Sequence, residues 1–170
     1  MSGPATRALY PGSFDPVTCG HLDVIRRGVA LFGSLTIAIG RNPGKRPLFT
    51  VDERIALLRE VVAAERLAAE VVAFEGLVVD FARRSGAKAL LRGVRSASDF
   101  DYEQSMAQMN RQLAPQVETL LVVPHAPLAF ISGRLVRESG SFGADLEGLV
   151  PECIRARVEE RLKEGRARGD

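Results

Sequence analysis

Residues 9–21 read LYPGSFDPVTCGH, and the rest of the chain is organised around this stretch. It continues a short apolar strand over 8–10, which Pro11 and Gly12 interrupt, and a turn-rich loop leads to a helix that opens near Gly20 and His21. Apolar residues at spacings of three and four give this helix one apolar face: Leu22, Ile25, Val29 and Phe32. A glycine turn before a helix N-terminus forms an anion site, because the first N–H groups of a helix lack partners and its dipole favours negative charge. We therefore expect a phosphate group here; the alternative is that residues 18–21 only cap the helix and His21 is a surface residue.

The composition is that of an ordinary globular domain. With 170 residues, 46% of them hydrophobic and 26% charged, the chain is long enough to bury a core, and we expect a single domain over 1–170. The net charge of +2 is too small to indicate a nucleic-acid partner, and no apolar run reaches the roughly 18 residues of a membrane span. Cys19 and Cys153 have no metal-ligand spacing, and the first residues lack the apolar core of a signal peptide, so we expect reduced thiols in a cytoplasmic protein.

Strand patterns alternate with helix patterns along the chain. Apolar and β-branched runs predict five strands, at 8–10, 34–40, 71–74, 89–91 and 119–123. Helices are predicted from about residue 20, after Thr50, over 77–85 with Gly86 at the end, after a capping Asp99, over 131–139 and, beyond a loop at 140–148, over about 151–166. This alternation predicts an α/β fold, a Rossmann-like doubly wound domain with a five-stranded, mostly parallel sheet.

Cations follow the predicted strands at the edge where their carboxyl ends meet. Ligands of such sheets bind outside the carboxyl ends of the strands. The sequence places these residues there: His21, Lys45, Arg92, Arg95 and Arg134. Each cation alone would ordinarily be a solvated surface residue. Four cations and two helix N-termini at one edge predict a cleft for a polyphosphate.

Missing motifs exclude several phosphate chemistries. The chain has neither a G-x-x-x-x-G-K-[ST] loop nor a G-x-G-x-x-G fingerprint, and no Ser-His-Asp arrangement is evident. Cys19 lies at a helix N-terminus, which could lower the pKa of its thiol, but no partner base is evident. A reaction in which a phosphate of one substrate attacks a phosphorus of another needs no protein nucleophile. The enzyme then only aligns two polyanions and stabilises transition-state charge.

Several motifs in a fixed order carry a family resemblance. Residues 10–16 (YPGSFDP) and Thr18-x-Gly20-His21 resemble the signature of the nucleotidylyltransferase superfamily. Residues 92–95 (RGVR), 99–103 (DFDYE) and 109–111 (MNR) are similar, in order and spacing, to motifs of the bacterial phosphopantetheine adenylyltransferases. The resemblance covers nearly the whole chain, from Arg7 to about Arg161.

This resemblance implies adenylyl transfer from ATP to 4′-phosphopantetheine, giving dephospho-coenzyme A and pyrophosphate, with Mg²⁺ and without a covalent intermediate. It implies His21, Lys45 and Arg92 as catalytic residues, with His21 stabilising the transition state. Ser13 and Lys45 would hold the attacking phosphate, and Arg92 the pantetheine end. The implied ATP site is Ser13, Phe14, His21, Gly93, Val94, Arg95, Glu103, Leu128, Ala129, Phe130, Ile131, Ser132, Gly133 and Arg134, and the implied pantetheine wall adds Leu77, Val78 and Asn110. The resemblance also implies a homohexamer, a dimer of trimers, with coenzyme A as a possible inhibitor.

The sequence departs from the family pattern at two places. Where the family usually has a run of hydroxyl residues, this chain has Ser132-Gly133-Arg134, which removes two hydroxyl donors and adds a guanidinium. We expect Arg134 to contact the β- or γ-phosphate through a charge-assisted hydrogen bond. The alternative is a solvent-exposed Arg134 and weaker ATP binding. Leu128 stands where the family often has an aromatic ring, so stacking on adenine is lost.

Two other functions stay open at this point. One is a related nucleotidylyltransferase that acts on a different phosphate, although the motifs at 92–95 and 100–103 argue against it. The other is a module that senses ATP or coenzyme A without turnover, which only the altered turn at 132–134 favours. Release of pyrophosphate distinguishes catalysis from binding alone.

Overall fold

The computed structural model describes residues 6–41 and 47–167, and these residues form a five-stranded sheet. The strands are β1 (Ala8–Gly12), β2 (Leu35–Gly40), β3 (Ala69–Phe74), β4 (Ala89–Gly93) and β5 (Glu118–Val122). Their order is β3-β2-β1-β4-β5, and every neighbouring pair is parallel. The predicted Rossmann-like α/β fold is therefore confirmed.

In the described residues, six α-helices and one short 3₁₀ turn connect and follow the strands. The helices are α1 (Cys19–Phe32), α2 (Val51–Ala64), α3 (Val78–Ser85), α4 (Ala97–Leu113), α5 (Gly133–Ser141) and α6 (Glu152–Ala167), and the turn η1 covers Ala126–Leu128. Gly86 ends α3 with a φ of 71°, as predicted, a conformation that glycine adopts without strain. Within the described parts of the chain, no helix is long and apolar enough to cross a membrane.

Several predicted boundaries differ from those in the structure, and three of them are corrected as follows. Ser96, not Asp99, caps α4, and its hydroxyl accepts a hydrogen bond from the backbone N–H of Asp99 at 3.2 Å. Arg92 lies within β4 instead of in the loop after it. Helix α5 continues through Gly140, where a Cβ atom would lie 2.5 Å from a methyl group of Leu162, so the glycine permits close packing of α6 and the loop begins later than predicted.

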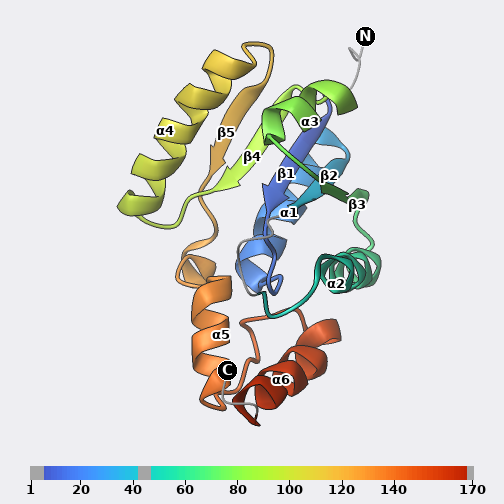
Figure 1. Ribbon diagram of the computed structural model, residues 1–170, viewed down its shortest axis with the longest axis vertical. Helices are drawn as coiled ribbons and strands as arrows, with labels where there is room; N and C mark the ends of the chain where they lie inside the picture. The colour runs from blue at the N-terminus through green and yellow to red at the C-terminus, as the bar shows by residue number, and fades with distance from the viewer. Residues whose placement is uncertain (1–5, 42–46, 168–170) are drawn as a thin grey trace.

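The sheet separates two apolar clusters, because successive residues of a strand face opposite sides. Leu9 and Leu90 belong to a cluster with Val79 and other residues of α3, whereas Tyr10 belongs to a larger cluster that includes residues of α1, α2, α5 and α6. Helices α1 and α3 therefore cover opposite faces of the sheet. In Figure 1, α5 and α6 lie beyond the carboxyl end of β1, in the lower half of the view.

The chain reverses its direction of winding at β1, which pairs with β2 on one side and with β4 on the other. In open α/β sheets, the carboxyl ends of two such strands border the crevice in which ligands bind. The fold therefore places the loop after β1 and the end of β4 at the expected position of a site.

Candidate active site

The loop between β1 and α1 forms the floor of the site. The backbone carbonyl of Ser13 accepts a hydrogen bond of 2.7 Å from the guanidinium of Arg54, a buried residue of α2. Phe14 follows with a φ of 46°, which is uncommon for residues other than glycine, and its ring is buried. A buried cation and a buried ring thus hold the loop, while Ser13 stays exposed.

His21 takes part in capping α1, which is one of the two alternatives that the sequence left open. The hydroxyl of Thr18 accepts a hydrogen bond from the backbone N–H of His21 at 3.3 Å, and the backbone N–H of Thr18 donates to His21 Nδ1 at 3.0 Å. Because Nδ1 accepts this bond, we assign the proton of the uncharged imidazole to Nε2. Burial, followed by the positive charges of Arg95 and Arg92, lowers the pKa of His21 to about 4. At neutral pH, His21 is therefore a helix cap and an uncharged hydrogen-bond donor.

A cavity of about 340 Å³ opens at the carboxyl ends of β1 and β4. Eleven predicted residues line it, from β4, from α1, α4 and α5, and from the loops beside them: Ser13, Phe14, His21, Arg92, Gly93, Arg95, Glu103, Ile131, Ser132, Gly133 and Arg134. Four others lie outside this lining: Val94 is buried, Leu128 packs against the core, Ala129 is half-buried, and Phe130 is exposed. The predicted Lys45 lies outside the described residues.

A second cavity, of about 540 Å³, adjoins the first. It brings together the three residues predicted for the pantetheine wall, Leu77, Val78 and Asn110, with apolar side chains of α4, Met106, Met109 and Leu113. The two cavities share Pro11, Gly12, Ser13, Arg92 and Glu103. The arrangement offers one space rich in cations and one rich in apolar side chains, which meet at the end of β1.

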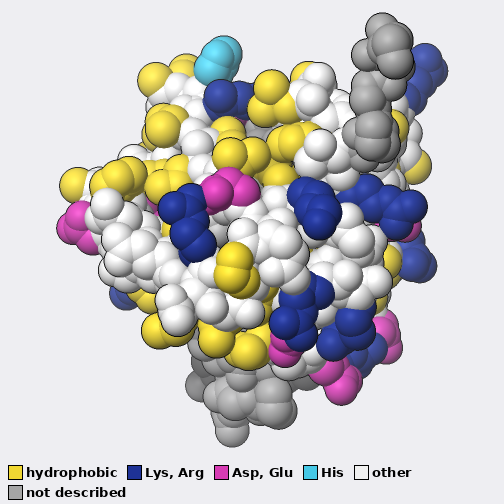
Figure 2. Space-filling view, turned by 90° about the horizontal axis from the view of Figure 1, so that it is seen from above, with side chains coloured by type: hydrophobic (Ala, Val, Ile, Leu, Met, Phe, Trp, Pro, Cys, Tyr) yellow, Lys and Arg dark blue, Asp and Glu magenta, His cyan; other side chains and the backbone are white. Residues whose placement is uncertain are grey.

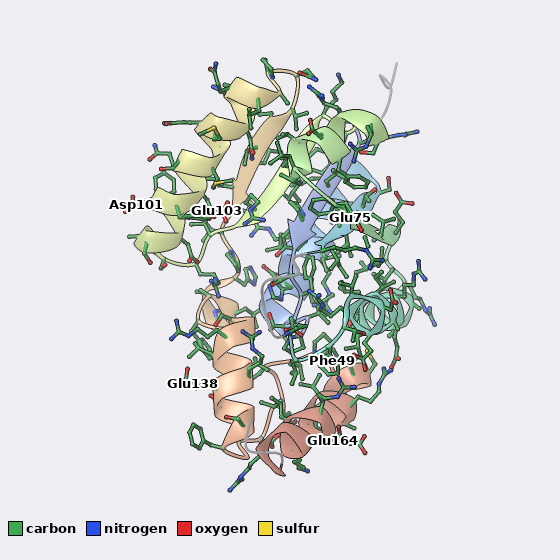
Figure 3. All side chains as sticks on the ribbon, viewed as in Figure 1. Phe49, Glu75, Asp101, Glu103, Glu138 and Glu164 are labelled. Atoms are coloured by element: carbon green, nitrogen blue, oxygen red, sulfur yellow. The ribbon has the colours of Figure 1, made fainter. Side chains whose placement is uncertain are left out.

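An ion pair lies where the two cavities meet. Nε and Nη2 of Arg92 donate to the two carboxylate oxygens of Glu103 at 2.8 and 2.6 Å, and Nη1 donates to the carbonyl of Pro11 at 2.8 Å. Burial alone would lower the pKa of Arg92, but the hydrogen bonds and charge of Glu103 raise it above its usual value. Figure 3 shows Glu103 pointing from α4 toward the strands, whereas Asp101 points away from them. Glu103, predicted as an ATP contact, therefore also fixes the orientation of Arg92.

The other predicted arginines of the first cavity differ in their partners. Nε of Arg95 lies 3.0 Å from the carboxylate of Asp99, so this guanidinium is already paired. Arg134 is exposed on the first turn of α5, and no carboxylate within 4.0 Å of it is found in residues 6–41 and 47–167. Its guanidinium is therefore available to an anionic ligand.

Two side chains of the site were missed in the sequence. The buried carboxylate of Asp15 accepts hydrogen bonds from the backbone N–H groups of Leu48 and Phe49 at 2.8 and 2.9 Å. Arg137 lines the first cavity and donates to the backbone carbonyl of Asp15. An aspartate before a proline is typical of a turn, so Asp15 gave no separate signal. The three-residue spacing of Arg134 and Arg137 could have indicated that both lie on one face of a helix.

The helix N-terminus does not lower the pKa of the Cys19 thiol. Burial raises the pKa of Cys19, and the opposing effect of Arg26 is smaller. Although Cys19 is the first residue of α1, its half-buried side chain packs against the main apolar cluster. Desolvation of the thiolate therefore outweighs the helix N-terminus. Cys19 does not provide an activated nucleophile.

Comparison with known proteins reveals relatives of nearly the same length. The family described as cytidylyltransferase-like matches residues 9–139. A phosphopantetheine adenylyltransferase from Anaeromyxobacter sp. (strain K) is 48% identical over 155 residues, which make up 91% of this chain and 94% of that protein. Another, from Geotalea daltonii, is 44% identical over 160 residues, or 94% of this chain and 98% of that protein.

A solved structure shares the fold at low identity. The bifunctional NMN adenylyltransferase/ADP ribose pyrophosphatase from Francisella tularensis matches with a TM-score of 0.70 at 13% identity, over 95% of this chain and 50% of that protein. This likeness supports the α/β fold alone, whereas the relatives at 48% and 44% identity match over nearly their whole length. The chain thus belongs to the phosphopantetheine adenylyltransferase family.

Proposed function

We propose that this chain transfers the adenylyl group of ATP to 4′-phosphopantetheine, giving dephospho-coenzyme A and pyrophosphate. The observation that carries this proposal is the pair of adjoining cavities at the carboxyl ends of β1 and β4. ATP would occupy the first cavity, beside the N-termini of α1 and α5. The pantetheine arm would lie in the second, against Leu77 and Val78. Membership of the family supports the same reaction.

The chemistry follows from what the side chains offer. A phosphate oxygen of the acceptor attacks the α-phosphorus of ATP, and the bond from that phosphorus to the oxygen of the leaving pyrophosphate breaks. His21 donates from Nε2 to an oxygen of the α-phosphate, where negative charge develops in the transition state. Ser13 and Lys45 hold the attacking phosphate, and Arg92 holds the pantetheine end of the acceptor. Alignment and charge stabilisation then supply the catalysis without a covalent intermediate.

Mg²⁺ fits this site as an ion that arrives with ATP. No group of three or more His, Cys, Asp or Glu side chains suited to a metal is found in the described part of the chain. The three carboxylates that line the first cavity are already engaged, Asp15 by backbone N–H groups, Asp99 by Arg95 and Glu103 by Arg92. Mg²⁺ bound mainly by phosphate oxygens and water needs no dedicated protein cage. We therefore propose MgATP as the substrate.

We expect Arg134→Ala to raise the KM for ATP by roughly tenfold and to change kcat little, because a charge-assisted contact to the β- or γ-phosphate is lost at an exposed position. Arg26→Ala is a matched control, since Arg26 is an exposed arginine on α1 that pairs with Glu65 and does not line the cavity. Steady-state kinetics with varied ATP measure both variants. An unchanged KM in Arg134→Ala would mean that this side chain faces solvent when ATP is bound.

The proposed reaction is tested by pyrophosphate release from MgATP with and without 4′-phosphopantetheine. We expect release only when the acceptor is present, and dephospho-coenzyme A as the second product. Release with nicotinamide mononucleotide or a polyol phosphate instead would indicate a related nucleotidylyltransferase. ATP binding without release for any acceptor would favour a sensing module.

We also propose a homohexamer in the cytoplasm, inhibited by coenzyme A. Helix α4 supports an assembly because it exposes the large apolar side chain of Phe100, which lines neither cavity. Figure 2 shows hydrophobic side chains gathered on the left, the side on which α4 lies in Figure 1, and most basic side chains on the right. Coenzyme A contains both an adenylyl group and a pantetheine arm, so it would occupy both cavities. Sedimentation equilibrium, with and without coenzyme A, measures the mass of the assembly.

A further inference from the structure

The side chain of Phe14 contacts the imidazole of His21. The centroids of the two rings are 5.1 Å apart and their planes meet at 68°, an edge-to-face arrangement. On its other side, the ring of Phe14 meets Tyr10 with a centroid distance of 5.2 Å and an angle of 81°. Phe14 is only 1% exposed. A row of three rings therefore runs from the end of β1 to the first turn of α1.

The backbone of the loop is shaped to accept this ring. A Cβ atom at Gly12 would lie 2.8 Å from Cζ and 2.9 Å from Cε2 of Phe14, so a side chain at position 12 would push the ring away. Phe14 also adopts a φ of 46°, which residues other than glycine seldom adopt. An uncommon backbone conformation of this kind persists where the surroundings fix it, and such residues gather at functional sites.

We propose that Phe14 is a positioning residue: its ring holds the imidazole of His21 in one orientation and keeps water from that side of it. Thr18 fixes Nδ1, and Phe14 fixes the plane of the ring, so that Nε2–H stays directed at the α-phosphate. The proposal rests on the role proposed above for His21. The resemblance to the family assigned Phe14 to the ATP site, whereas here its side chain acts on a histidine.

The effect of Phe14 on the pKa of His21 can be distinguished from the effect of the charged groups around His21. The charged groups that face His21 are Arg92 on β4 and Arg95 after it, and both oppose protonation of the imidazole. Phe14 carries no charge, so its replacement by leucine leaves the charges of Arg92 and Arg95, and their bonds to Glu103 and Asp99, in the site. Removing the ring of Phe14 therefore admits water and leaves both cations in place. Burial is the largest cause of the lowered pKa of His21, so hydration raises this pKa.

The test is Phe14→Leu, with Phe32→Leu as the matched control. Phe32 lies at the other end of α1 and packs against the same apolar cluster, but it is remote from His21 in the helix. In Phe14→Leu, we expect kcat to fall by roughly tenfold while the KM for ATP changes by less than about twofold, because a misplaced donor weakens transition-state binding. We also expect the pKa of His21 to rise by about one unit from its value of about 4.

Proton NMR measures this pKa directly. The chain has two histidines, and the imidazole signals that disappear in His21→Ala belong to His21. A folded Phe14→Leu variant with the wild-type titration of His21, and with a kcat equal to that of Phe32→Leu, would overturn the proposal. If instead His21→Ala retains full turnover, the role of His21 fails, while the titration still reports whether Phe14 shields the imidazole.

Gly12→Ala provides a second test that leaves Phe14 in the chain. The added methyl group displaces the ring of Phe14 without deleting it. We expect the pKa of His21 to rise in this variant too, and the NMR titration is its readout because Gly12 itself lines both cavities. If Phe14→Leu does not fold, an unchanged titration in Gly12→Ala would refute the proposal.

Discussion

His21→Ala is expected to lower kcat on the order of 10²–10³-fold, with the KM for ATP changed by less than about threefold. The uncharged Nε2–H bonds most strongly when negative charge develops on the α-phosphate oxygens, so its loss affects the transition state more than the bound substrate. The pKa of about 4 makes His21 a donor of a hydrogen bond, not a cation, at neutral pH. Single-turnover release of pyrophosphate measures the chemical step.

A loss of stability is too small to explain such a decrease. His21→Ala removes the acceptor for the backbone N–H of Thr18, and losing a helix cap costs roughly 1 kcal/mol. If the variant stays folded after this loss, nearly all of its molecules remain in the folded state, so unfolding does not account for the lower kcat. His125→Ala is the matched control, because His125 is the chain's other histidine and is exposed. Turnover by His21→Ala within threefold of that control would refute the assignment of His21.

The fold could be predicted because its signals are local. Apolar runs identified all five strands. Thr18 and Thr50 are the N-cap residues of α1 and α2, and cap residues of this type mark the start of a helix in a sequence. The errors occurred where contacts with residues distant in the sequence determine where a strand or helix ends. Arg92 stays within β4 because this strand pairs with β5 as far as Gly93, and the close approach of Leu162 lets α5 run past Gly140.

The candidate site was predicted less completely, for a physical reason. Motifs name the residues that face a ligand, such as Ser13 and Arg134, but not the groups that hold them. The carboxylate of Asp15 binds backbone N–H groups 33 and 34 residues away, and such partners leave no periodic pattern in a sequence. The burial of a side chain likewise cannot be predicted from its position within a helix alone. The N-terminal position of Cys19 suggested a lowered thiol pKa, but its packing raises that pKa.

The second large effect is expected for Arg92. Arg92→Met should lower kcat/KM for 4′-phosphopantetheine by at least about 10²-fold, because a guanidinium that holds the acceptor is lost where the two cavities meet. The same change leaves the carboxylate of Glu103, which is 10% exposed, without its two hydrogen bonds. Leaving such a charge unpaired costs up to about 3 kcal/mol of folding free energy. Urea denaturation and steady-state kinetics together measure the two losses.

A double variant separates binding from stability. In Arg92→Met/Glu103→Leu, both charges are gone, and replacing a buried ion pair by apolar side chains is often neutral for stability. We therefore expect the urea midpoint to return toward the wild-type value while kcat/KM for 4′-phosphopantetheine stays low. Arg92→Lys completes the series, since an ammonium keeps the charge but cannot form the two parallel bonds to Glu103. If the double variant recovers its activity together with its stability, Arg92 serves the fold and another residue holds the acceptor.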